Sequence, residues 1–338
     1  MQLAPDNEPQ KAFPPRQEGE VFGVMYCTKT FTWWLREYWL SILIGMLQKL
    51  VEHNEHTIGF LKTVSGKLVA YKMLVPHGKF YLGNIIRMAG QYNPEIESME
   101  KVIQVSDWCR SEADFWRILL PFCGRRTPLP DPDFHLPPTS LHAFTDAAGG
   151  STVTIGMGCG AVLGSWWTYV PWGPVINGGK KYIDGKMYKH KMALLELLGP
   201  LVVVAGASHL VRDSQLIIPV DNSGSVAIFR KGWCSSCMLS TTVVLAIHKV
   251  ACALNCNIEI VKIRRCSDRL TQAADALSKT QFSKFRKLVP EANVEPGRIP
   301  SEIVKWIENP REDRYLGERI LKEIGMKGSM LGRHGFYL

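Results

Sequence analysis

The stretch His142-Ala143-Phe144-Thr145-Asp146-Ala147-Ala148-Gly149-Gly150 decides how the second half of the chain is expected to fold. An apolar, strand-like run ends in one carboxylate, Asp146, and then breaks into small residues and glycines. Such a break leaves the Asp146 side chain at a strand end, where a loop can open a site. An aspartate here is by itself usually a turn-former, so its meaning depends on acids further along the chain.

The residues that follow alternate between strand-like and helical patterns. We expect Asn222 to cap the helix that begins after it. The order of three strands, a helix, a strand, helices, a strand and a helix predicts an α/β fold with a mixed five-stranded sheet. The strands are expected at 141–146, 153–163, 166–175, 216–220 and 257–263, and the helices at 189–209, after 222, at 240–254 and at 269–279.

The first 138 residues are expected to be mostly helical, after a short strand at 22–26. Helices are predicted at 31–53, around 65–71, and at 81–89, 95–105 and 112–122. Thr127–Pro138 holds five prolines, which is typical of an extended linker. The predicted organisation is a disordered lead-in at 1–20, a helical region at 21–126, the linker at 127–138, an α/β domain at 139–280 and a helical basic tail at 281–338.

Charge and cysteine content favour an intracellular protein with a polyanionic partner. The chain carries 40 Lys and Arg against 31 Asp and Glu, and residues 139–280 alone carry 14 against 8. Nine cysteines, without a secretory leader in the proline-rich first 20 residues, indicate a reducing setting, cytoplasmic or nuclear. The most apolar stretch, Met192–Val211, contains Glu196 and Pro200 and predicts a buried helix rather than a membrane span.

Three further acids give Asp146 its significance. Asp221 ends the predicted strand at 216–220, as Asp146 ends the strand before it. Glu196 is the only charge within its leucine-rich helix, where burying an unpaired carboxylate would cost several kcal/mol. Asp275 lies among alanines, which would let a ligand or another segment approach closely. Four such acids either have separate structural roles or form one cluster.

A cluster of the four acids would gather oxygen atoms at one edge of the sheet. Like charges raise one another's pKa unless cations neutralise them. Oxygen-only ligands select Mg²⁺ or Mn²⁺ rather than Zn²⁺. Two such ions about 4 Å apart can activate a water and stabilise the leaving oxygen of a phosphodiester. The cluster therefore predicts metal-dependent phosphodiester hydrolysis.

The acids lie in an ordered series of short motifs. The motifs are Thr145-Asp146-Ala147, Gly158-Cys159-Gly160-Ala161-Val162, Leu194-Leu195-Glu196-Leu197, Val220-Asp221-Asn222-Ser223 and Ala274-Asp275-Ala276-Leu277-Ser278-Lys279. This series resembles the ribonuclease H domain of retrotransposon reverse transcriptases, with DIRS-like and gypsy-like elements as the nearest types. The resemblance covers about residues 21–325 and implies a ribonuclease H-like sheet with flanking helices. For residues 21–126 it implies a thumb- or connection-like region.

The resemblance implies an endonuclease that hydrolyses the RNA strand of an RNA–DNA hybrid. The family's acids come in the order Asp, Glu, Asp, Asp, which matches Asp146, Glu196, Asp221 and Asp275; these four would hold two Mg²⁺ or Mn²⁺ ions. Asn222 and Ser223, at a helix start, are expected to contact phosphate or 2′-hydroxyl groups, and Arg265 to contact substrate. The expected partners are the hybrid and a separate reverse transcriptase polymerase chain, without a membrane.

Two departures from the family leave alternatives open. No Tyr-x-Asp-Asp pair occurs, so DNA synthesis by this chain is not expected. Many ribonucleases H carry a His in the loop before the last acid, whereas the corresponding loop of this chain has none. Either turnover of the nuclease is slower for lack of this His, or Arg265 partly takes its place. A domesticated or decayed element fragment that binds nucleic acid or protein without cleavage is the alternative function. Integrases of the same fold usually end the acid series in Glu, which argues against them.

A zinc site is the competing prediction for the cysteines. Cys234 and Cys237 are followed by Cys252 and Cys256. The second pair has helical spacing in an apolar segment, where cysteines are usually small buried groups. Trp233 lies beside basic residues and is either a contact for a sugar or base or a core aromatic.

Overall fold

The computed structural model forms two compact units, residues 1–134 and residues 135–337. The described residues are 17–21, 23–72, 74–75, 78–91, 98–123, 127–128, 140–148, 157–172, 181–183, 186–188, 192–234, 236–264 and 268–326.

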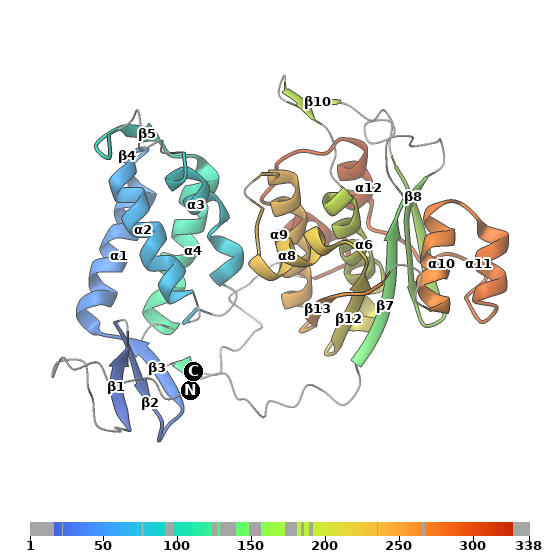
Figure 1. Ribbon diagram of the computed structural model, residues 1–338, viewed down its shortest axis with the longest axis horizontal. Helices are drawn as coiled ribbons and strands as arrows, with labels where there is room; N and C mark the ends of the chain where they lie inside the picture. Colours follow the sequence, from blue (N-terminus) through green and yellow to red (C-terminus); the bar gives the residue numbers. More distant parts are fainter. Residues whose placement is uncertain are drawn as a thin grey trace. The chain divides into compact units, whose positions relative to one another are not determined.

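The first unit contains a helical bundle (Figure 1). Its first helix buries four leucines that recur every three or four residues and so form one apolar stripe. In the last helix the buried Trp116 donates its indole N–H to the Tyr81 carbonyl at 2.8 Å. The helices are α1 (Glu37–Glu52), α2 (Ile58–Tyr71), α3 (Gly83–Ala89) and α4 (Asp107–Cys123), with a 3-10 turn at Gly78–Tyr81.

Short strands replace two parts of the first unit that were predicted to be helical. Thr32–Leu35 pairs antiparallel with Val24–Cys27, and Val102–Gln104 pairs with Glu55–Thr57. The helix predictions at 31–53 and 95–105 were therefore wrong over these residues. One sheet has the order β1 (Glu18–Val21), β2 (Val24–Cys27), β3 (Thr32–Leu35), β6 (Thr127–Pro128), and the other joins β4 (Glu55–Thr57) to β5 (Val102–Gln104).

The second unit is built on a five-stranded mixed sheet, as the sequence predicted. The central strand β7 is antiparallel to β8 and parallel to β12. Strand β13 is parallel to β12, and β9 is antiparallel to β8. The order across the sheet is β13 (Asn257–Lys262), β12 (Gln215–Val220), β7 (Ser140–Ala147), β8 (Gly158–Leu163), β9 (Trp166–Pro171).

Helices cover both faces of this sheet (Figure 1). On one face, Gly199 of α6 (Met192–Gly206) lies against Thr145, and a Cβ at Gly199 would be 2.6 Å from the Thr145 Cβ. On the other face, α10 (Arg269–Ser278) lies against Gly160. Because Thr145 and Asp146 are consecutive in a strand, their side chains point to opposite faces. Asp146 therefore points to the face that α10 covers.

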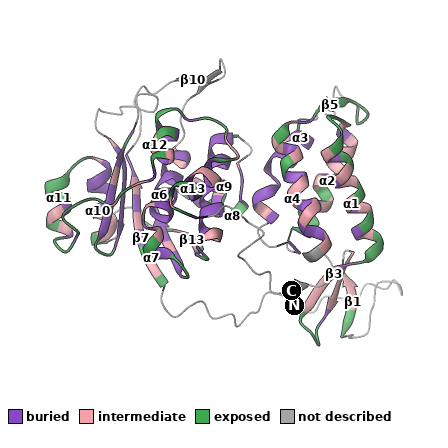
Figure 2. Cartoon of the chain, turned by 180° about the vertical axis from the view of Figure 1, so that it is seen from behind, coloured by how far each residue is buried: buried purple, intermediate pink, exposed green. Residues whose placement is uncertain are grey.

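Helix α6 is deeply buried, since its residues from Leu194 to Ala205 are all buried. Figure 2 shows this contrast with α11 (Phe282–Leu288), which is largely exposed. Helix α9 (Met238–Ala253) packs on α6. Among the described helices, none is long and apolar enough to cross a membrane.

The segment predicted as one helix at 189–209 contains α6 and a short second helix, α7 (Ser208–Val211). A hairpin of β10 (Lys181–Ile183) and β11 (Lys186–Tyr188) precedes α6. After β12, the predicted cap is confirmed: Asn222 Oδ1 accepts from the Ser225 N–H at 3.1 Å and starts α8 (Ser223–Lys231).

The last third of the unit wraps around the sheet. Helix α11 packs on α10, while α13 (Leu316–Glu323) packs on α9, which belongs to the other face. Between them the chain follows the outer edge of β9, where the Asn293 and Gly297 N–H groups donate to Ser165 and Trp167 carbonyls at 2.8 and 2.7 Å. This segment, completed by α12 (Ser301–Glu308), covers an edge strand that would otherwise be open to pairing.

Candidate active site

Parallel pairing of β7 and β12 brings two of the predicted site residues to the same edge of the sheet. Ile217 of β12 is paired with His142 of β7. Four residues further along each strand stand Asp221 and Asp146, both partly exposed. Their carboxylates act on one another, since the charge of Asp221 contributes to a raised pKa of Asp146. The strand-end prediction for these two acids agrees with this placement.

Asp275 reaches the same edge because Gly160 leaves room for α10. Gly160 is the cross-strand partner of Asp146 on β8. A Cβ at Gly160 would lie 2.5 Å from the Leu277 Cβ and 2.6 Å from the Ala274 carbonyl oxygen, so the helix rests directly on the strand. This close approach brings the charge of Asp275 to bear on Asp146.

The last turn of α10 holds Asp146 by a direct contact. The Ser278 hydroxyl donates to Asp146 Oδ2 at 2.6 Å. Burial raises the pKa of Asp146, and repulsion from Asp275 and Asp221 raises it further. The Ser278 hydrogen bond and the positive charge of Lys279 oppose this rise. Asp146 is thus a carboxylate whose charge is costly and only partly compensated.

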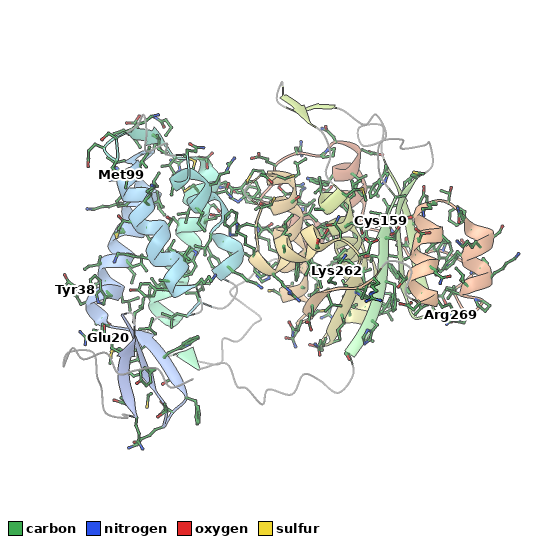
Figure 3. All side chains as sticks on the ribbon, viewed as in Figure 1. Glu20, Tyr38, Met99, Cys159, Lys262 and Arg269 are labelled. Carbon is green, nitrogen blue, oxygen red and sulfur yellow. The ribbon has the colours of Figure 1, made fainter. Side chains whose placement is uncertain are left out.

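Glu196 approaches from the opposite face of the sheet, on α6, and only 4% of it is exposed. The position of Glu196 relative to Asp146 is reflected in Cys159, a fully buried residue of β8 that is labelled in Figure 3. Burial raises the pKa of the Cys159 thiol well above its usual range, and the charges of Glu196 and Asp146 raise it further. The thiol therefore lies within electrostatic range of both Glu196 and Asp146.

Two lysines contact members of the acid cluster, defined as Asp146, Glu196, Asp221 and Asp275. Lys279 Nζ lies 2.5 Å from Asp275 Oδ1. Lys262, at the end of β13 and labelled in Figure 3, donates to the backbone carbonyl of Asp221. Arg264 follows it and is exposed. The edge of the sheet thus combines buried and half-buried acids with exposed and half-exposed basic side chains.

The acid cluster offers the oxygen ligands that Mg²⁺ and Mn²⁺ prefer. Over the residues that the structure describes, no three His, Cys, Asp or Glu side chains converge closely enough to ligate one ion as they are placed. Ser278 and Lys279 instead engage one oxygen each of Asp146 and Asp275. The donor chemistry fits a hard divalent cation, and joint ligation requires these side chains to turn toward a common centre.

The three predicted substrate residues have different placements. Asn222 uses its Oδ1 to cap α8, and Ser223 is the exposed first residue of that helix. The start of α8 also contacts the start of α6, because Ser225 Oγ donates to the Ala193 carbonyl at 3.1 Å. Asn222 and Ser223 therefore lie near the helix that carries Glu196. Arg265 lies outside the described residues.

The four cysteines of the zinc alternative do not come together. Cys237 precedes α9 and Cys252 lies in its last turn, so about 20 Å of helix separates them. Burial raises the pKa of Cys252 to about 12 and that of Cys256 to about 11, which disfavours the thiolate form that zinc requires. Trp233 is a buried aromatic with Lys231 Nζ 3.5 Å above its ring, which favours the core alternative.

Ser278 and Lys279 are site residues to which the sequence reasoning gave no role. They follow Asp275 by three and four residues, and this spacing puts all three on one side of a helix. This spacing is the feature of the sequence from which a role for Ser278 and Lys279 beside Asp275 could have been predicted.

No known protein family, curated protein or solved structure matches this chain. The acid cluster and its surroundings are therefore the basis for inferring a function.

Proposed function

We propose that the second unit is a metal-dependent endonuclease of the ribonuclease H type, which hydrolyses the RNA strand of an RNA–DNA hybrid. One observation carries the proposal: Asp146 and Asp221 stand at the same edge of two paired parallel strands, and α10, which carries Asp275, rests on Gly160, the cross-strand partner of Asp146. Carboxylates placed together in this way repel one another and destabilise the folded protein unless a bound cation neutralises them. The mixed five-stranded sheet with helices on both faces is also the layout that the resemblance implies.

Bound divalent cations would activate a water and stabilise the leaving oxygen of the phosphodiester. The chain's own groups have the remaining tasks. Asp146 and Asp221 present oxygens from the strand ends, and Glu196 and Asp275 present them from the two helical faces. Ser278 favours the ionised form of Asp146, which is the form that binds cations.

Substrate binding is assigned to the polar rim of the cluster. Asn222 and Ser223 are at a helix start, which suits contacts to phosphate or to a 2′-hydroxyl. Lys262 and Arg264 are exposed and suit the sugar-phosphate backbone. Because these contacts are ionic, hybrid binding is expected to weaken steeply with salt. A separate polymerase chain and an intracellular setting remain predictions from the sequence.

Binding without cleavage is the second candidate, and a specific observation favours it. Lys279 already pairs with Asp275, and the described acids do not converge as they are placed. A chain that retained this pairing would bind nucleic acid through its basic rim and not hydrolyse it.

A cleavage assay separates the two candidates. An RNA–DNA hybrid labelled on each strand is incubated with Mg²⁺ or Mn²⁺ and with the wild type, Asp221→Asn or Glu259→Gln. Glu259 is an exposed acid of β13 and controls for loss of one charge. We expect cutting of the RNA strand alone by the wild type and the control, with loss of at least about 100-fold in Asp221→Asn. Hybrid binding without metal-dependent cutting would reject the nuclease in favour of the binding function.

A further inference from the structure

Lys279, the C-cap residue that directly follows α10, pairs with the side chain of an acid of the cluster. Lys279 Nζ lies 2.5 Å from Asp275 Oδ1, at the i, i+4 spacing that places a basic residue after an acidic one. The Asp275 side chain is 11% exposed and that of Lys279 is 34% exposed. The pair is therefore shielded on the acid side and open to solvent on the lysine side.

The same end of α10 also contacts a second acid of the cluster, Asp146. Ser278, the neighbour of Lys279, is fully buried and donates to Asp146 Oδ2. The close fit of α10 on Gly160 fixes the position of this end of the helix. The ammonium of Lys279 is thus paired with one carboxylate of the cluster, and the adjacent Ser278 is hydrogen-bonded to another.

We propose that Lys279 is a built-in counter-cation, which holds one carboxylate oxygen of Asp275 and which a divalent cation must displace in order to bind the acid cluster. The proposal rests on the proposed function, in that it takes the cluster to be the metal site. Lys279 is a positioning residue: it keeps the cluster folded while no ion is bound. Its long, partly exposed side chain can move into solvent without disturbing the helix.

The displacement has a consequence for metal affinity. An ion that binds must break the Lys279–Asp275 pair, so this pair lowers the apparent affinity. Removing the ammonium leaves the repulsion among the acids uncompensated, and the ion then gains more on binding. Replacing lysine by arginine retains the competing charge.

Mn²⁺ binding to the full chain, measured by the loss of the free-ion electron paramagnetic resonance signal, tests the proposal without any reaction. The variants are Lys279→Met, Lys279→Arg and Asp275→Asn, with Lys284→Met as a matched control on the exposed side of α11. We expect Lys279→Met to bind Mn²⁺ about tenfold more tightly than the wild type. We expect Lys279→Arg and Lys284→Met to stay near wild type, and Asp275→Asn to bind more weakly. Circular dichroism establishes that each variant is folded.

If folded Lys279→Met binds Mn²⁺ as tightly as the wild type or more weakly, the counter-cation proposal is wrong. It is also wrong if neither the wild type nor Lys279→Met binds Mn²⁺. The proposed nuclease fails in a different way. If Mn²⁺ binds with the expected dependence on Lys279 and the hybrid is still not cut, the counter-cation stands and the nuclease function is rejected.

Discussion

At the scale of single residues, Asp146 shows how a half-buried carboxylate among other acids stays available for cation binding. Its Oδ2 accepts from the Ser278 hydroxyl, which opposes the effects of burial and repulsion on its pKa. Ser278, which lies three residues after Asp275, therefore stabilises the ionised form of Asp146.

Ser278→Ala is expected to raise the pKa of Asp146 further, because the hydrogen bond that favours the ionised form is lost. The unfolding free energy should fall by about 1–2 kcal/mol, since the serine is fully buried. The carboxyl ¹³C resonance of Asp146, followed against pH, gives the midpoint directly. The exposed Ser283→Ala is the control, and a midpoint that does not move in Ser278→Ala would contradict the role assigned to the hydroxyl.

Glu112 is the most unusual acid of the first unit. It is buried and accepts hydrogen bonds from the Asn84 and Ile85 backbone N–H groups and from the Asn84 side chain at 2.9–3.1 Å, so it caps α3. Burial nevertheless raises the pKa of Glu112 to about 7, against these hydrogen bonds and the nearby charge of Arg87. The folded unit therefore binds this proton more tightly than the unfolded chain does.

This shift predicts that Glu112 makes the first unit less stable as pH rises. Its ordinary pKa is 4.5, so between about pH 4.5 and 7 the folded state holds more protons than the unfolded state. The wild type should lose about 3 kcal/mol relative to Glu112→Gln across this window, and the difference should level off above it. Urea unfolding at several pH values measures the effect, with the exposed Glu37→Gln as control. A pH-independent difference would show that the pKa is not raised.

At the scale of elements, the contact of α10 with β8 decides whether the cluster forms. Gly160 is the point of contact, since a Cβ there would overlap both Leu277 and the α10 backbone. Glycine at this position is thus a requirement of helix–strand packing, and it acts on Asp275 only through the position of the helix.

Gly160→Ala is expected to destabilise the second unit by about 1–3 kcal/mol and to weaken Mn²⁺ binding, because α10 must move away from the strand. Thermal unfolding and Mn²⁺ titration measure the two effects. Gly45→Ala in α1 is the control: its Cβ would meet no atom within 4 Å, and it should stabilise by about 0.5–1 kcal/mol. Wild-type metal affinity in Gly160→Ala would refute the link between packing and site.

Element prediction succeeded where a segment's own pattern was long and periodic. The core strands 140–147, 215–220 and 257–262 and the helices 238–253 and 269–278 lie close to the predicted ranges. The failures, Thr32–Leu35 and Val102–Gln104, are strands of three or four residues. Such strands exist because a distant partner supplies their hydrogen bonds, and a local pattern contains no information about that partner.

At the scale of the whole molecule, residues 281–326 pack as part of the second unit. Lys249 of α9 is buried, and its Nζ donates to the Arg314 carbonyl at 2.7 Å and to Glu318 Oε1 at 2.6 Å. Burial lowers the pKa of Lys249, while the charge of Glu318 favours its protonated form. This contact fastens α13 to the core.

Glu318→Ala is expected to cost about 2 kcal/mol of unfolding free energy, less than a fully buried pair would, because Glu318 is partly exposed. The loss arises mainly from leaving the Lys249 ammonium buried without its carboxylate. Guanidinium unfolding measures it, with the exposed Glu312→Ala as control. Equal stability of the two variants would mean that the lysine gains nothing from its partner.

The acids of the candidate site could be chosen from the sequence, because strand ends and an isolated charge in an apolar helix are visible there. Two features could not be: the parallel register that sets Asp221 beside Asp146, and the helix contact at Gly160. Each depends on residues far apart in the chain or on side-chain geometry. Residues such as Arg265 that lie outside the described structure stay predictions.

The most direct test of the central claim is a crystal structure of the full chain soaked in Mn²⁺, with anomalous scattering used to locate the ion. We predict an anomalous peak at the edge of the sheet, within ligand distance of Asp146 and Asp221, with the Lys279 ammonium moved away from Asp275. A crystal that shows no peak among the four acids at millimolar Mn²⁺, with Lys279 still paired to Asp275, would contradict the metal site and the hydrolysis built on it.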